Sequence, residues 1–115
     1  MPRAPATLQT AIVAVPETSG SALYGMIDVL SATGNLWQTL VGVEPQPRVF
    51  DVRIVSPSAE PFRCGNAIPV VPDAAVADDP PADLVILPEI WLGPDESVAG
   101  RHPALVEWVR RRYRA

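Results

Sequence analysis

The sequence predicts a mostly parallel α/β domain, and three observations carry this prediction. Residues 10–15 and 82–87 are short, continuous apolar runs, which is typical of strands buried on both faces of a sheet. Apolar residues at helical spacing follow both runs, and strands that alternate with helices indicate right-handed crossovers and a parallel sheet. With 115 residues the chain can form at most one domain, and it is short for a sheet covered on both faces.

The first helix is expected directly after the first strand. Thr18, Ser19 and Ser21 supply capping hydroxyls, and Leu23, Met26, Ile27 and Leu30 recur at helical spacing up to Gly34 and Asn35. Residues 36–41 could extend a second helical segment, after which Pro45 and Pro47 enforce a loop.

The rest of the chain predicts a strand, a hairpin and a final helix. Residues 50–54 alternate between apolar and charged side chains, which favours a strand near a sheet edge. A turn at residues 64–66 predicts a small hairpin. The final helix begins at Pro103, with His102 at its N-cap and Leu105, Trp108 and Val109 on one apolar face.

Composition excludes several classes of function. A net charge of −4 argues against a surface that binds duplex DNA, because phosphate contacts need clustered basic residues. No apolar run reaches the length of a membrane span and the amino terminus lacks a signal-peptide core, so we expect a cytoplasmic protein. One cysteine and one histidine are too few for a zinc site, and we expect no metal and no cofactor.

Four segments in this order resemble a known superfamily: TSGSALYGMIDVL, FDVRIVSP, IPVVPDAAVAD and DLVILPEIWLG. The chain resembles PfpI-type proteases, protein deglycases and the sensor domains of GlxA/AraC-type transcription regulators. The resemblance implies a flavodoxin-like, class I glutamine amidotransferase-like α/β sandwich. In such proteins the domain continues into a strand that ends in a nucleophile elbow with a cysteine. Nothing in these 115 residues corresponds to that elbow, so we expect the fold to be incomplete and to leave an unpaired, exposed or partner-covered sheet edge.

Two departures from the enzymatic pattern favour a binding domain. The resemblance implies an acidic residue early in the first helix, where this chain has Ala22. It also implies two consecutive glycines after the VILP strand, where Glu89 and Ile90 stand. A carboxylate beside a developing oxyanion is unfavourable, and Ile cannot easily take positive φ. We therefore assign no catalytic residue.

Glu17, Glu89, Ile90 and Trp91 are the candidate ligand-binding residues. The carboxyl ends of parallel strands line the ligand crevice in α/β sheets, and these residues follow the two buried strands. For Glu89 a structural role is equally plausible, and Trp91 could instead be a lid or a dimer contact. Glu17 could also serve the positive end of the first helix.

Three further features have structural interpretations. Cys64 is better interpreted as a buried or interface cysteine than as a nucleophile. Asp28 is interpreted as solvated or capping, and not as the partner of Glu17. The cluster of Arg110, Arg111, Arg112 and Arg114 suits the carboxyl end of a helix better than a nucleic-acid patch.

Together these features predict the amino-terminal half of a regulator's sensor domain, at residues 10–115, after a disordered segment at residues 1–9. Its expected partners are a second copy of itself and a small-molecule effector, with DNA bound by a separate helix-turn-helix region that these residues do not contain. The alternatives are part of a PfpI-like cysteine hydrolase or hydratase whose nucleophile lies beyond Ala115, or a short reading frame without a function of its own.

Overall fold

The computed structural model describes residues 6–44 and 47–115. Along the chain its elements are β1 (Leu8–Val13), α1 (Gly20–Ala32), α2 (Leu36–Leu40), β2 (Phe50–Ser56), β3 (Phe62–Cys64), the 3₁₀ turn η1 (Gly65–Ala67), β4 (Ile68–Val70), β5 (Ala74–Ala75), the 3₁₀ turn η2 (Val76–Asp78), β6 (Leu84–Ile86) and α3 (Pro103–Arg114). None of the helices in these two ranges is long and apolar enough to cross a bilayer.

The central sheet has four strands in the order β5-β2-β1-β6, and every neighbouring pair is parallel. β1 pairs with β2 along its whole length, from Leu8 opposite Phe50 to Val13 opposite Val55. On its other side β1 pairs with β6, with Ala11 opposite Val85. The predicted α/β fold with a mostly parallel sheet is confirmed.

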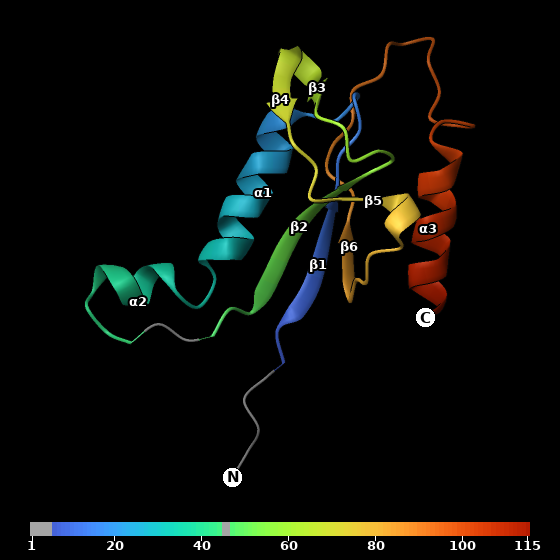
Figure 1. Cartoon of the computed structure of the whole chain (residues 1–115). Helices are drawn as coiled ribbons and strands as arrows, with labels where there is room; N and C mark the ends of the chain where they lie inside the picture. Colours follow the sequence, from blue (N-terminus) through green and yellow to red (C-terminus); the bar gives the residue numbers. More distant parts are fainter. Residues whose placement is uncertain (1–5, 45–46) are drawn as a thin grey trace.

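Helices cover both faces of this sheet (Figure 1). On one face α1 and the β3–β4 hairpin pack over Ile12 and Ala14 of the β1 segment. On the other face α3 packs Leu105 and Trp108 against Val13. Residues along a strand alternate between faces, so the continuous apolar run of β1 is buried on both sides, as predicted.

The hairpin and the two later helices form where the sequence predicts them. β3 and β4 are antiparallel, with Cys64 opposite Ile68. Asn66 and Ala67 in the connecting turn both have φ of 59°. α2 is confirmed as a short helix, and His102 stands at the N-cap of α3, with Pro103 at its first position.

Several boundaries and environments differ from the predictions. β1 begins at Leu8, so Leu8 and Gln9 belong to the sheet and not to a disordered terminus, while residues 1–5 and the predicted loop residue Pro45 lie outside the described residues. Ser19 is the N-cap of α1, but no side-chain hydroxyl caps that helix. The hydroxyl of Thr18 instead accepts a hydrogen bond from the Val15 amide at 2.9 Å.

The second buried strand of the prediction is only half-buried. β6 is three residues long, all three are partly exposed, and Leu87 directly after it is 64% exposed. The apolar run predicted a strand covered on both faces. In the described residues β6 is instead the edge strand of the sheet, with a strand partner on one side alone, and its residues stay partly exposed. β2 is second from the other edge, because β5 pairs with its last two residues, Val55 and Ser56.

Candidate functional site

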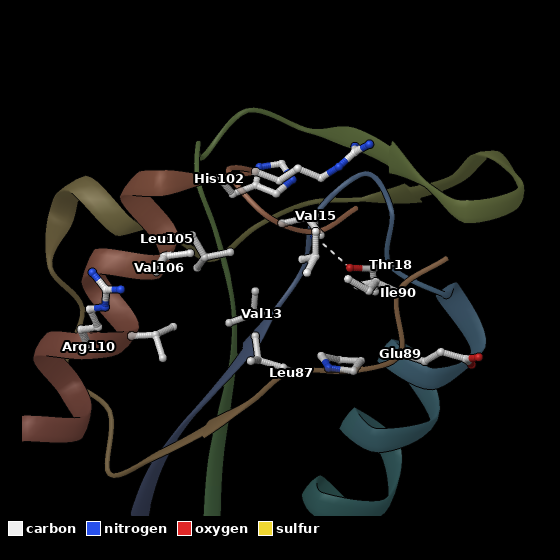
Figure 2. A pocket seen from close by; sticks show the side chains of 14 residues that line it. Val13, Val15, Thr18, Leu87, Glu89, Ile90, His102, Leu105, Val106 and Arg110 are labelled. Carbon is white, nitrogen blue, oxygen red and sulfur yellow. Dashed lines mark hydrogen bonds between the residues drawn. The ribbon is translucent and has the colours of Figure 1, made fainter. Parts of the chain in front are cut away.

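An apolar groove of about 580 Å³ lies at the carboxyl end of the sheet, between β6 and α3 (Figure 2). Its walls come from the ends of β1 and β6, the loop after β6 and the inner side of α3. The apolar lining residues are Val13, Val15, Leu87, Pro88, Ile90, Val98, Leu105, Val106 and Val109, and the polar ones are Thr18, Glu89, Arg101, His102 and Arg110. This arrangement suits an apolar body with a polar or anionic group near the rim.

The loops after β1 and β6 are joined by backbone hydrogen bonds. Thr18 and Ile90 form an isolated antiparallel bridge. The Ser19 amide donates to the Glu89 carbonyl at 2.8 Å, and the Trp91 amide donates to the Glu17 carbonyl at 2.7 Å. The amide of Gly65 also donates to the Thr18 carbonyl, at 2.9 Å, so the hairpin supports the same loop. These bonds fix the end wall of the groove.

A charged cluster closes the rim of this wall. The carboxylate of Glu17 accepts a hydrogen bond from Arg101 at 3.2 Å and lies 2.9 Å from Nε2 of His102. Arg101 also donates to Glu96 at 2.7 Å and to the Ser97 carbonyl at 2.8 Å. The cluster ties the loop before α3 to the loop after β1, two segments more than 80 residues apart in sequence.

Both carboxylates of this cluster are held in their ionised form. Partial burial raises the pKa of Glu17. Hydrogen bonds from His102, a backbone amide and Arg101, together with the charge of His102, lower this pKa by more, so the net shift is downward. The amide of Gly93 and then Arg101 lower the pKa of Glu96 in the same way. Glu17 and Glu96 therefore stay charged at neutral pH and hold Arg101 in place.

The structure brings the four predicted ligand-binding residues to the same edge of the sheet, but not to the same surface. Glu89 and Ile90 line the groove, although the Glu89 side chain is exposed and points away from His102 (Figure 2). Glu17 does not line the groove itself and reaches it only through Arg101 and His102. Its side chain contacts these two residues and not the start of α1, which was its alternative role. Trp91 is 49% exposed and lies beside Gly65 of the hairpin, outside the groove. Ligand binding by these residues stays a prediction.

The remaining residues lie where their structural interpretations place them. Cys64 is buried on the α1 side of the sheet, among Ile12 and Leu23, and does not line the groove. Asp28 is exposed on α1. Arg111 and Arg112 both reach Asp79, with N–O distances of 3.5 and 3.2 Å.

Sequence reasoning missed the contribution of α3 to the groove. Val106, Val109 and Arg110 of α3 line it, as does Arg101 in the loop before the helix, and none was a ligand-binding candidate. Val106, Val109, Arg110 and Tyr113 follow the spacing i, i+3, i+4, i+7, which marks one helical face beside the buried face of Leu105 and Trp108. This spacing could have identified the second face from the sequence. No pattern in the sequence indicates the contact of Glu17 with residues 101 and 102.

Comparison with known proteins supports the fold alone. No protein-family model matches the chain, and no curated protein sequence matches it. A crystal structure of a Vibrio parahaemolyticus protein, provisionally described as a transcriptional regulator, is similar, with a TM-score of 0.65 at 19% sequence identity. The match covers 94% of this chain and 52% of that one, so this chain spans about half the length of its structural neighbour.

Proposed function

We propose that this chain is the ligand-sensing and dimerisation part of a GlxA/AraC-type transcription regulator, acting in the cytoplasm without catalysis. The observation that carries the proposal is the apolar groove at the carboxyl end of a parallel sheet, which is where α/β folds bind small molecules. A neighbour provisionally described as a transcriptional regulator supports the same assignment at the level of the fold.

The loop after β6 supports binding over catalysis. In the amidotransferase-like enzymes that the chain resembles, consecutive glycines in this loop can direct amides at an oxyanion. Here the Trp91 amide donates to the Glu17 carbonyl, and Ile90 is in a bridge with Thr18. The thiol of Cys64 lies outside the groove. The groove walls therefore offer contacts for binding, and DNA contact belongs to a separate helix-turn-helix region.

Filling the groove tests this proposal. Val98 and Val71 are both exposed valines, at 59% and 66%, but only Val98 lines the groove. We expect the chain to bind the fluorescent apolar anion 8-anilinonaphthalene-1-sulfonate, and Val98→Trp to weaken that binding at least about fivefold, since the new ring occupies the groove. Val71→Trp is the matched control and should bind the dye like the wild type.

The same assay identifies effectors. A panel of small carboxylates and other metabolites is then screened for compounds that displace the dye and raise the melting temperature, as a ligand of the native state must. The Val98→Trp variant should lose both effects. Equal dye binding by the two tryptophan variants, or chemical turnover of a bound compound by the wild type, would contradict the proposal.

A further inference from the structure

We propose that residues 93–101 form a lid at the rim of the groove, and that Glu17 fastens this lid at both of its ends. The lid opens to admit a small apolar ligand and is fastened again over the bound ligand. The inference rests on the ligand-sensing part of the proposed function, and it names the element of the chain that responds to a ligand.

The lid is an exposed loop held together by its own contacts. In Figure 1 it belongs to the orange loop that rises beyond the carboxyl end of the sheet and returns to α3. All of its residues except the first and the last are exposed. The Glu96 amide donates to the Gly93 carbonyl at 3.0 Å, and Arg101 donates to the Glu96 carboxylate at 2.7 Å and to the Ser97 carbonyl at 2.8 Å. Because these bonds all lie within the loop, the lid can separate from the sheet without losing them.

A single residue, Glu17, fastens the lid to the rest of the chain. Just before the lid, the Trp91 amide donates to the Glu17 carbonyl at 2.7 Å. At the other end, the Glu17 carboxylate lies 3.2 Å from Arg101 and 2.9 Å from His102. In the described residues, no other hydrogen bond or ion pair joins residues 91–101 to another part of the chain. Release of the carboxylate contacts therefore frees the far end of the lid, while the Trp91 bond keeps its near end in place.

The lid presents one aliphatic side chain to the groove. Val98 lines the groove and is nevertheless 59% exposed, so the groove does not bury it in this structure. An apolar ligand beneath Val98 would bury more of this side chain and so favour the fastened state of the lid. Gly100 has φ of 77°, a conformation that glycine adopts freely, so the backbone between Val98 and the Glu17 contacts can turn with little strain.

Hydrogen exchange at short labelling times tests the Glu17 contacts with no ligand present. Glu17→Gln removes the charge that holds Arg101, so peptides that cover the lid should exchange at least about threefold faster than in the wild type. A peptide that covers α2, which lies outside the groove, should keep its wild-type rate. Asp95→Asn is the matched control, because Asp95 is an exposed carboxylate of the lid with no ion pair in the described residues. Its lid should exchange like that of the wild type.

Dye release tests the lid with a ligand in the groove. In stopped-flow experiments, 8-anilinonaphthalene-1-sulfonate should leave Glu17→Gln at least about threefold faster than it leaves the wild type, because an unfastened lid opens more often. Asp95→Asn also removes one negative charge near the rim, so it controls for weaker repulsion of the anionic dye, and it should release the dye like the wild type. Saturating dye should in addition slow the exchange of the lid in the wild type.

Two results would overturn the lid while the proposed function stands. One is lid exchange that is equally fast in Glu17→Gln and in the wild type. The other is dye that binds the wild type and leaves it as fast as it leaves Glu17→Gln. A wild type that binds no dye contradicts the proposed function itself, and the lid over a ligand with it. The two failures are distinguishable, because hydrogen exchange measures the Glu17 contacts without any ligand.

Discussion

Trp37 and Trp108 show how differently one residue type contributes at two positions of this chain. Trp108 is fully buried under the sheet, and its indole N–H donates to the Pro80 carbonyl at 3.2 Å, whereas Trp37 on α2 is 70% exposed. We expect Trp108→Ala to lower the free energy of unfolding by about 3–5 kcal/mol and Trp37→Ala by less than about 0.5 kcal/mol. Urea denaturation of both variants measures this, and similar losses would show that α3 does not cover the sheet.

The carboxylate of Glu17 makes stability depend on pH. Its pKa is lowered in the folded state, so the unfolded state binds more protons in the acidic range. The stabilisation is therefore complete above the ordinary carboxyl pKa of about 4.5 and is lost as pH falls through the lowered value. Glu17→Gln should reduce stability at pH 7 and flatten its decline below pH ~4.5.

Thermal unfolding across pH 3 to 7 checks this prediction for Glu17. Asp28→Asn is the control, because Asp28 is an exposed carboxylate on α1, the helix that covers the opposite face of the sheet from α3. Its curve should parallel that of the wild type. A Glu17→Gln curve that also parallels the wild type would show that the contacts with Arg101 and His102 contribute nothing to folding.

At the residue scale, the sequence predicts buried residues that recur at helical spacing, and it misses contacts between side chains far apart in the chain. Leu105 and Trp108 were predicted as a buried face because helical spacing places them together. Glu17, a ligand-binding candidate that could also serve the start of the adjacent helix, contacts Arg101 and His102. No spacing rule relates side chains so distant in sequence, because the sheet and the loop after β6 bring them together.

The β3–β4 hairpin contains a strained turn that gives a prediction at the scale of an element. Ala67 has φ of 59°, a left-handed conformation that a Cβ disfavours and glycine adopts freely. We expect Ala67→Gly to raise the free energy of unfolding by about 0.5–1 kcal/mol, because relief of this strain exceeds the added freedom of the unfolded chain.

Ala59→Gly is the matched control for the turn. Ala59 is also exposed, but it is not among the residues with positive φ, so glycine there should be neutral or destabilising. Denaturation of both variants under identical conditions separates the two effects. Destabilisation by Ala67→Gly of the size seen at Ala59 would contradict the left-handed turn.

β6 shows why element type is easier to predict than element environment. Its apolar run correctly predicts a strand, since β-branched and aliphatic residues fit a pleated surface. Burial depends in addition on strand order, which a local run does not contain. β1 lies between two strands and is covered on both faces, whereas β6 has a strand partner on one side only in the described residues. The groove is open on the side where β6 has no strand partner in the described residues. Without the strand order, the sequence could not show that α3 lies beside β6 and forms a wall of the groove.

For the molecule as a whole, the distribution of charge determines whether this chain can contact DNA. Acidic residues outnumber basic ones by 13 to 9, and three of the four arginines that cluster on α3 have carboxylate partners. Arg111 and Arg112 share Asp79, and Arg110 approaches Glu107. A phosphate backbone would have to compete with these carboxylates and with the overall negative field. In the proposed regulator, DNA contact therefore belongs to another region.

We accordingly expect no saturable binding of this chain to a fluorescently labelled duplex at about 10 µM protein and 150 mM salt, a range in which non-specific DNA-binding proteins bind measurably. Fluorescence anisotropy measures this directly. Arg111→Gln with Arg112→Gln removes both partners of Asp79 and serves as the companion variant. The decisive contrary result would be wild-type binding that weakens steeply with added salt and disappears in the companion variant. Such a salt slope counts the phosphates neutralised, so it would place a DNA-contacting surface on α3 and displace the separate helix-turn-helix region from the proposal.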